Sequence, residues 1–245
     1  MLAFFLSSIN PAGMIALSAT QPSISSVTVH PLKVVALGDS VIYGFGDPEG
    51  GGWVERLRRR SMTPGSTEPV FYNLGVRGDG VQQVSHRFEQ EFRLRGELRN
   101  RVPDLIMLSV GVNDSARLGK PNGRFMTPIQ SFQQQMSGLL SRARPLCPVL
   151  FVGMPPVDEA AMPFAEVLYY AQADQQSYRD VTRQACLTYG VPYLDVFDLW
   201  LQRGGDWWRS RLCPDGLHPN PLGYRSLLED ILGWESFQRH LDISG

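Results

Sequence analysis

The chain has 245 residues, of which 43% are hydrophobic and 19% are charged, and its formal net charge at pH 7 is −1. This composition is typical of a globular protein rather than a disordered one, and the length allows a sizeable buried core in one or two domains. A net charge so close to zero gives no overall basic field to attract nucleic acid or an anionic membrane.

The first 32 residues stand apart from the rest. Residues 1–6 and 14–16 are apolar, but no lysine or arginine precedes Lys33, so the positive region of a signal peptide is missing. We predict an irregular N-terminal extension over residues 1–32 that packs on the domain, and a cytoplasmic protein. The alternative is export through a weak N-terminal signal. No run approaches the roughly 18 apolar residues of a membrane span, so no integral membrane association is expected.

Strand-like and helix-like segments alternate from Lys33 onward, which predicts a single domain over residues 33–245. In chain order we expect a strand at 33–37, a helix at 49–60, a strand at 69–76, a helix at 81–98, a strand at 105–110, a helix from Thr127 as N-cap and Pro128, a strand at 148–154, a helix at 165–189, a strand at 191–196 and a helix behind Asn220-Pro221. Five apolar strands separated by helices predict an α/β fold with a parallel sheet covered on both faces.

Four short motifs follow predicted strands, at the edge where open α/β sheets bind ligands. The first, Gly38-Asp39-Ser40, comes directly after the strand that begins at Lys33. A serine there places its hydroxyl beside the N-terminus of the next helix, where backbone N–H groups favour a developing negative charge. The alternative is a plain strand-to-helix turn, because these three residue types are common in turns.

The second and third motifs supply hydrogen-bond donors. Residues 73–80 read N-L-G-V-R-G-D-G, and their glycines allow the backbone to approach a ligand closely. Residues 111–114 read G-V-N-D, in which Asn113 offers a neutral side-chain N–H of the kind used in oxyanion holes. Taken alone, either motif is equally typical of a flexible turn, an Asx turn or a helix cap.

The fourth motif, Asp215-Gly216-Leu217-His218-Pro219, carries an acid and a base. Pro214 and Pro219 keep the segment out of a helix, so a carboxylate three residues before an imidazole can reach it in a bent loop. Asp215 then accepts a hydrogen bond from Nδ1–H of His218 and leaves Nε2 free as a base. A surface histidine in a turn is the alternative, but this pattern is far rarer by chance than Gly-Asp-Ser.

Together the motifs provide a nucleophile, hydrogen-bond donors and a base at one edge of the sheet. They predict a serine hydrolase in which Ser40 attacks an ester carbonyl and His218 removes its proton. This chemistry needs no metal and no organic cofactor. The three cysteines, at positions 147, 186 and 213, form no C-x-x-C pair, and their odd, sparse count argues against a disulfide scaffold.

The four motifs closely resemble those of the GDSL esterases, also called SGNH hydrolases, from about Lys33 to the last predicted helix. The matching segments are A-L-G-D-S-V-I-Y-G at residues 36–44, N-L-G-V-R-G-D at 73–79, G-V-N-D at 111–114 and D-G-L-H-P-N at 215–220. The resemblance implies Ser40 as nucleophile, His218 as base and Asp215 as its acid. The one departure is a valine in place of the leucine in the family's name motif, and it changes only a packing position.

The resemblance also implies an oxyanion hole. It would combine the backbone N–H of Ser40, the side chain of Asn113 and the backbone N–H of either Gly75 or Gly78. The spacing from Asn73 and the acidic residue that follows favour Gly78, as in secreted thioesterase and lysophospholipase members of the family.

The family's fold is a flavodoxin-like three-layer α/β/α sandwich with a five-stranded parallel sheet, in agreement with the five strands read from the sequence itself. Loops after the first four strands should line the substrate pocket, with Tyr43, Phe45, Met126, Met154, Pro155 and Phe164 as candidates. These side chains suggest an apolar acyl site, so we expect a small-molecule acyl ester, short-chain by default. A thioester, a lysophospholipid and an acetylated carbohydrate are the alternatives.

Two hypotheses from other functional classes are alternatives to the esterase. A flavodoxin-like module that binds a nucleotide or flavin would need a phosphate loop after the first strand, and residues 38–44 lack the usual glycine- and hydroxyl-rich pattern. A catalytically idle scaffold for protein interaction would have no need to retain every catalytic residue type. The sequence leaves the oligomeric state open.

Overall fold

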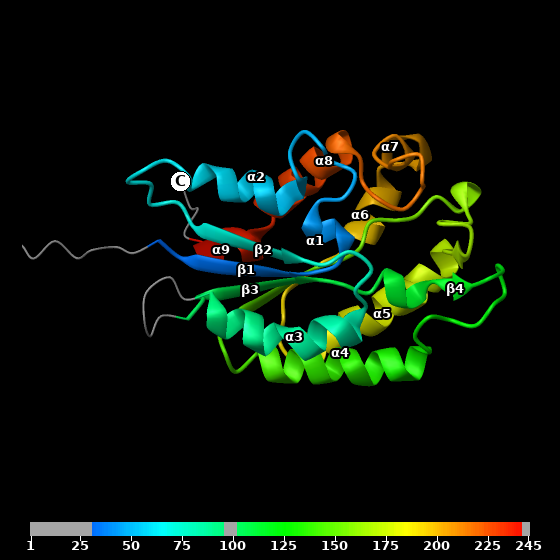
Figure 1. Cartoon of the computed structure of the whole chain (residues 1–245), viewed down its shortest axis with the longest axis horizontal. Helices are drawn as coiled ribbons and strands as arrows, with labels where there is room; N and C mark the ends of the chain where they lie inside the picture. Colours follow the sequence, from blue (N-terminus) through cyan, green and yellow to red (C-terminus); the bar gives the residue numbers. More distant parts are fainter. Residues whose placement is uncertain (1–30, 96–101, 242–245) are drawn as a thin grey trace, which may run out of the picture.

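The computed structural model describes residues 31–95 and 102–241 (Figure 1). The predicted N-terminal extension therefore lies outside the described residues except for its last two positions. Within the described part of the chain, no helix is both long and apolar enough to cross a membrane.

The described residues are built around a five-stranded parallel sheet. Its strands lie in the order β2-β1-β3-β5-β7, with bounds Val70–Gly75, Lys33–Gly38, Leu105–Ser109, Val149–Val152 and Tyr193–Leu194. This is the strand order of the flavodoxin-like doubly wound fold. The predicted fold class is confirmed.

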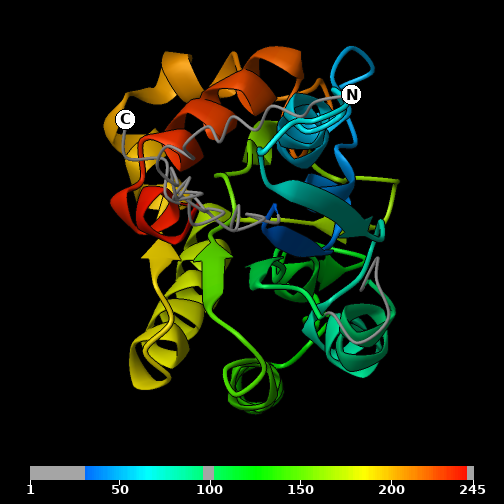
Figure 2. The same cartoon turned by 90° about the vertical axis from the view of Figure 1, so that its left-hand side faces the viewer.

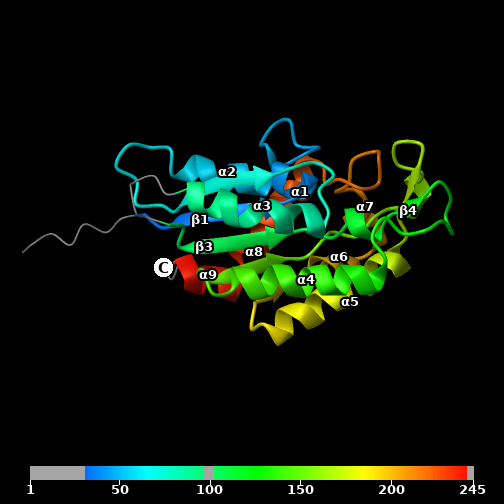
Figure 3. The same cartoon turned by 60° about the horizontal axis from the view of Figure 1, so that its bottom comes forward.

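Helices cover both faces of the sheet and make the outer two of three layers (Figure 2). One face carries α3 (Val81–Leu94), α4 (Ile129–Ala143) and α5 (Gln172–Thr188), and Figure 3 shows α4 and α5 lying side by side. The other face carries α2 (Gly52–Arg60), α6 (Val196–Gln202), α8 (Pro221–Leu232) and α9 (Glu235–Leu241). The short helix α7 is Gly205–Arg209.

The two faces of the sheet form two separate hydrophobic cores. Along β1, Val35 and Leu37 point into one core and Val34 and Ala36 into the other, as the two-residue period of a strand requires. All four side chains are fully buried, so the strand is apolar throughout instead of alternating with polar residues. This explains why the sequence of β1 reads as one apolar run.

The predicted helix over residues 165–189 is wrong in its first part. Helix α5 begins only at Gln172, and Ala165 and Glu166 have positive φ angles of 49° and 65°. The segment instead forms β6 (Leu168–Tyr169), which pairs antiparallel with β4 (Arg117–Leu118). Pairing with a segment about fifty residues earlier in the chain therefore replaces the start of the predicted helix.

Two predicted element ends are wrong and a third is confirmed. Pro128, not Thr127, is the N-cap of α4, because the Thr127 hydroxyl donates to the buried carboxylate of Asp114 at 2.7 Å. The last strand is shorter than predicted, since Asp195 already caps helix α6. The Asn220 cap of α8 is confirmed, with its side chain accepting from the N–H of Gly223 at 2.9 Å.

Candidate active site

The end of β1 places Ser40 in the lining of a cavity. Asp39 caps the four-residue helix α1 (Ser40–Tyr43) by accepting from the N–H of Val41 at 2.9 Å, and Ser40 is the first residue of that helix. A Cβ on Gly38 would lie 1.9 Å from the carbonyl oxygen of Ser109, so only glycine lets β1 leave the sheet this close to β3.

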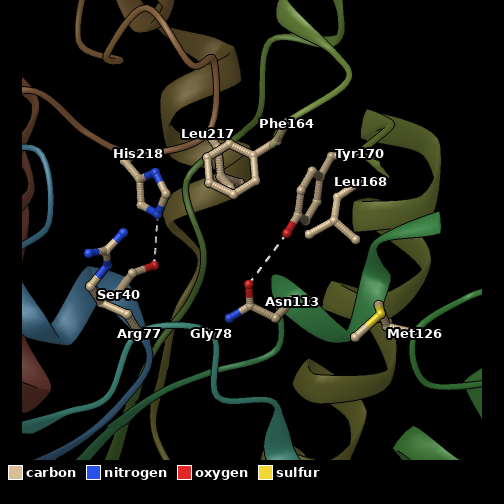
Figure 4. A pocket seen from close by; sticks show the side chains of 10 residues that line it. All are labelled: Ser40, Arg77, Gly78, Asn113, Met126, Phe164, Leu168, Tyr170, Leu217 and His218. Carbon is tan, nitrogen blue, oxygen red and sulfur yellow. Dashed lines mark hydrogen bonds between the residues drawn. The ribbon is translucent and has the colours of Figure 1, made fainter. Parts of the chain in front are cut away.

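Ser40, His218 and Asp215 form a continuous chain of hydrogen bonds, of which Figure 4 shows the bond between Ser40 and His218. Nε2 of His218 lies 2.9 Å from Oγ of Ser40, and Nδ1 lies 2.7 Å from Oδ2 of Asp215. The imidazole is almost fully buried, and the ring of Phe45 packs edge-on against it with 4.6 Å between centroids. The two motifs that are 178 residues apart in sequence are thus in direct contact.

Asp215 is held as a carboxylate by its own loop. Partial burial alone would raise its pKa, but the hydrogen bonds from the His218 ring and from the N–H groups of His218 and Leu217 outweigh this, and the pKa lies below its ordinary value. The bent Asp-x-x-His loop therefore supplies both the contact to the imidazole and the donors that keep the acid ionised.

Asn113 faces the same cavity from the loop after β3, in the 3₁₀ turn η1 (Asn113–Ser115). Its Nδ2 donates to the carbonyl of Asp79 at 2.9 Å, and its Oδ1 accepts from the hydroxyl of Tyr170 at 3.4 Å. With the amide oxygen engaged by a hydroxyl and one amide hydrogen engaged by a carbonyl, the second amide hydrogen is left for a ligand.

The two candidate glycines differ in their surroundings. Gly78 lines the cavity with a φ of 83°, and its N–H has no acceptor among the described residues. Gly75 ends β2, its N–H donates to the side chain of Asn73 at 3.1 Å, and a Cβ there would lie 2.1 Å from the backbone nitrogen of Tyr43. Gly78 is therefore the glycine whose N–H can face a ligand in this cavity.

The cavity has a volume of about 390 Å³ and is largely apolar. Its lining comprises Ser40, Arg77, Gly78, Asn113, Met126, Phe164, Leu168, Tyr170, Leu217 and His218. Of the side chains expected in the pocket, the structure places Met126 and Phe164 there.

The other four expected pocket residues lie elsewhere. Tyr43 and Phe45 line a neighbouring depression, and Phe45 contacts two residues of the cavity lining, His218 and Arg77, from outside the cavity. Met154 and Pro155 are buried, because α5 packs over the turn after β5 and the side chain of Gln175 donates to the carbonyl of Pro155 at 3.1 Å. The pocket predictions for these four residues are not supported.

Four residues that line the cavity were not predicted from the sequence to do so. Arg77 and Leu217 lie inside two of the four motifs, so their position next to Gly78 and His218 could have indicated that they line the pocket. Leu168 and Tyr170 lie at β6, in the segment interpreted as helix. Their place in the cavity depends on the pairing of β6 with β4, which no local pattern indicates.

Two buried carboxyl groups lie directly behind the site. Burial raises the pKa of Asp39 to about 7, with the N–H of Val41 acting in the opposite direction and the charges of Asp114 and Asp79 adding to the increase. Burial also raises the pKa of Asp114, against the hydrogen bonds from Thr127 and the N–H of Val81. Among the described residues, no group of three or more His, Cys, Asp or Glu side chains is arranged to hold a metal ion.

Comparison of the sequence with models of known protein families assigns the chain to a family. The model of the GDSL-like Lipase/Acylhydrolase family matches residues 36–226, which is most of the chain. The chain belongs to this family. It is accordingly a hydrolase. This favours the hypothesis of an enzyme over the two alternatives, a flavodoxin-like binding module and a catalytically idle scaffold. A comparison with curated proteins gives no match.

Solved structures show the same fold at low sequence identity. A lipase/acylhydrolase from Enterococcus faecalis is 20% identical with a TM-score of 0.64, over 82% of this chain and 93% of that chain. A variant of an acetyl xylan esterase from Geobacillus stearothermophilus is 17% identical with a TM-score of 0.61, over 87% and 96%. The psychrotrophic esterase EstA from Pseudoalteromonas sp. is 14% identical with a TM-score of 0.59, over 86% and 98%.

The raised pKa of Asp39 predicts a pH-dependent stability. Between the ordinary value of 3.8 and about 7, the folded protein holds a proton on Asp39 that the unfolded chain has released. The contribution of this group to the free energy of unfolding therefore falls as the pH rises through that window. Asp39→Asn keeps an oxygen for the N–H of Val41 and should flatten this dependence, measured by urea denaturation at several pH values.

The matched control is Asp206→Asn, at an exposed carboxylate in the first turn of α7. It should follow the wild-type pH profile. The assignment fails if Asp39→Asn and wild type lose stability in parallel between about pH 4 and pH 7.

Proposed function

We propose that this hydrolase cleaves carboxylic acyl esters through an acyl-enzyme on Ser40. The observation that carries the proposal is the unbroken chain from Ser40 Oγ through the His218 ring to Asp215, at 2.9 Å and 2.7 Å, on the wall of an apolar cavity. Both distances are within the range that proton transfer between a nucleophile and a general base requires.

Attack begins with transfer of the Ser40 proton to Nε2 of His218. The bond from Nδ1–H to Asp215 fixes the imidazole in the tautomer that has a free lone pair on Nε2, and the ionised carboxylate stabilises the imidazolium that forms. Because the ring is buried between Phe45 and Phe164, it is held in one orientation before substrate binds.

The tetrahedral intermediate needs donors for its oxyanion, and three residues that line the cavity can supply them. The donors are the backbone N–H groups of Ser40 and Gly78 and the free amide hydrogen of Asn113. Neither backbone N–H has an acceptor among the described residues, so no hydrogen bond must break when the oxyanion forms. Donors that are already oriented stabilise the charge without a reorganisation cost.

Collapse of the intermediate completes the first half of the reaction. His218 returns the proton to the leaving alcohol, and the acyl group remains on Ser40. A water molecule then repeats the sequence with His218 as its base and releases the acid. Residues of this chain can supply every proton transfer in the scheme.

The cavity favours a short or small acyl group. Its apolar wall consists of Met126, Phe164, Leu168 and Leu217, and its volume of about 390 Å³ lies near the lower end of small-molecule sites. A long acyl chain would have to leave the cavity. The fold shared with an acetyl xylan esterase makes acetylated sugars a second class worth testing, beside lysophospholipids and thioesters.

A series of p-nitrophenyl esters of increasing acyl length tests this proposal. We expect kcat/KM to be highest for short acyl groups and to fall once the chain outgrows the cavity, measured by release of p-nitrophenolate. Ser40→Ala should reduce hydrolysis to the background rate. Ser141→Ala, at an exposed serine on α4 whose hydroxyl contacts only its own helix, is the control.

Running acetylated sugars, a lysophospholipid and an acyl thioester beside the series separates the substrate classes. Equal activity of Ser40→Ala and Ser141→Ala would contradict the acyl-enzyme. A rate that keeps rising with acyl length would contradict the short-chain assignment and leave the nucleophile unaffected.

Removal of one oxyanion donor should act on the transition state. Asn113→Ala is expected to lower kcat by roughly a hundred- to a thousandfold, with a smaller change in KM, in a steady-state assay with the best short-chain ester. Tyr170→Phe leaves the Asn113 amide without its long 3.4 Å contact and should lower kcat by less. A variant Asn113→Ala with wild-type kcat would remove Asn113 from the oxyanion hole.

A further inference from the structure

The catalytic cavity contains one feature that ester hydrolysis itself does not use, the guanidinium of Arg77. This residue lies on the loop between β2 and α3, directly before Gly78, and its side chain lines the cavity. Every other cavity-lining side chain apart from Ser40, Asn113 and His218 is apolar or aromatic. A permanent positive charge therefore lines the same cavity as Ser40 and His218.

No carboxylate of the described residues balances this charge. Arg77 forms no ion pair and no hydrogen bond within residues 31–95 and 102–241. Other arginines near the site do have partners: Arg87 contacts Asp79 at 2.8 Å, and Arg56 contacts Asp47 at 2.8 Å. The five N–H donors of Arg77 are thus available to a ligand, in the planar fork that matches a carboxylate or a phosphate.

The side chain of Arg77 is held in place by an aromatic ring. Its Cζ lies 3.8 Å from the centroid of the Phe45 ring, and Phe45 in turn packs edge-on against His218. The carbonyl of Phe45 accepts from the hydroxyl of Tyr224 at 2.9 Å, which anchors the loop to α8. Stacking on an anchored ring reduces the freedom that Arg77 would lose on binding a ligand.

The position of Arg77 indicates which half of an ester it meets. In Figure 4, Ser40 and His218 lie between the guanidinium and the apolar wall formed by Phe164, Leu168 and Met126. An ester whose acyl group occupies the apolar side must direct its alcohol past His218, which protonates the leaving oxygen, toward Arg77. The two halves of the substrate thus meet opposite chemistry, one apolar and one cationic.

We propose that Arg77 is a specificity-determining residue, and that the preferred substrates are acyl esters whose leaving alcohol carries a carboxylate or a phosphate. This inference rests on the proposed esterase function and adds the class of alcohol to it. A bidentate contact between the guanidinium and the anion would bind the alcohol half while the acyl group lies against the apolar wall. Hydrolysis itself follows the same serine mechanism and needs no further reactant than water.

Matched pairs of esters test the proposal. The carboxylate arm compares 3- and 4-acetoxybenzoate with their neutral methyl esters, and the phosphate arm compares butyryl glycerol 3-phosphate with monobutyrin. A third arm compares a p-nitrophenyl ester that carries the carboxylate on its acyl group with the same ester in which that carboxylate is a neutral methyl ester. In each arm the measured quantity is the ratio of kcat/KM for the anionic ester to kcat/KM for its neutral partner.

The variants Arg77→Met and Arg77→Lys separate charge from shape. Arg77 is exposed on a loop, so neither change disturbs a core. Arg77→Met should lower the anionic-to-neutral ratio by roughly tenfold or more, the loss expected for a hydrogen bond to a charged group. Arg77→Lys, which keeps the charge without the fork, should lie between Arg77→Met and wild type.

Arg239→Met is the control for overall charge, since Arg239 lies on α9 at the opposite end of the sheet and is largely exposed. It should leave the ratio unchanged. Added salt should reduce the ratio in wild type more than in Arg77→Met, because screening weakens a partly exposed contact.

The outcomes are distinct. If wild type hydrolyses the neutral esters but Arg77→Met leaves the ratios of both alcohol arms unaltered, the role of Arg77 is wrong while the esterase stands. If the Arg77 dependence occurs only in the third arm, the anion belongs to the acyl half and the proposal is overturned. If wild type hydrolyses none of these esters and no p-nitrophenyl ester, the proposed function itself fails.

Discussion

Parallel strands end at the same edge of a sheet, and in this protein that constraint brings together residues far apart in sequence. Strands β1, β2 and β3 are direct neighbours with the same direction, so the segments that follow them emerge side by side. These segments carry Ser40, Gly78 and Asn113. Gly38 allows the end of β1 to lie close to β3 without a steric clash at Ser109. The loop that carries His218 then completes the site through the contact of His218 with Ser40.

The cluster of acidic groups behind this edge connects the motifs to one another. Asp114 accepts from the N–H of Val81 at the start of α3 and from Thr127 before α4, which ties the loop after β3 to two helices. Arg87 links the carboxylate of Asp79 to the carbonyl of Gly38 at 2.9 Å. The loops that carry Gly78 and Asn113 therefore rest on a network that is itself mostly buried. A buried network of this kind limits movement of its members.

Local sequence signals predicted the strands and motifs because both depend on chemistry within a few residues. The apolar run of β1 and the Asp215–His218 loop are examples, since burial on both faces and the bent loop each leave a direct pattern. The helix assigned to residues 165–189 failed at its start, because pairing between β6 and β4 joins segments about fifty residues apart. Met154 and Pro155 were expected in the pocket, but they are buried because α5 packs over the turn after β5. This packing, too, joins segments that are distant in sequence.

Arg77 illustrates a further limit of the sequence. Arg77 lies inside a family motif, but no local sequence pattern shows that its side chain stacks on Phe45. Only the three-dimensional arrangement shows a cation on one side of Ser40 and an apolar wall on the other. Such an asymmetric site can distinguish the two halves of an ester by charge as well as by size.

The central claim is that Ser40 is a nucleophile activated by His218, and covalent labelling tests it most directly. A fluorophosphonate probe reacts with an activated serine, and the modified residue can be located by peptide mass spectrometry. We predict one adduct, on Ser40, formed at a greatly reduced rate in His218→Ala. A protein that hydrolyses esters while Ser40 stays unlabelled, or that is labelled equally fast in His218→Ala, would contradict the account.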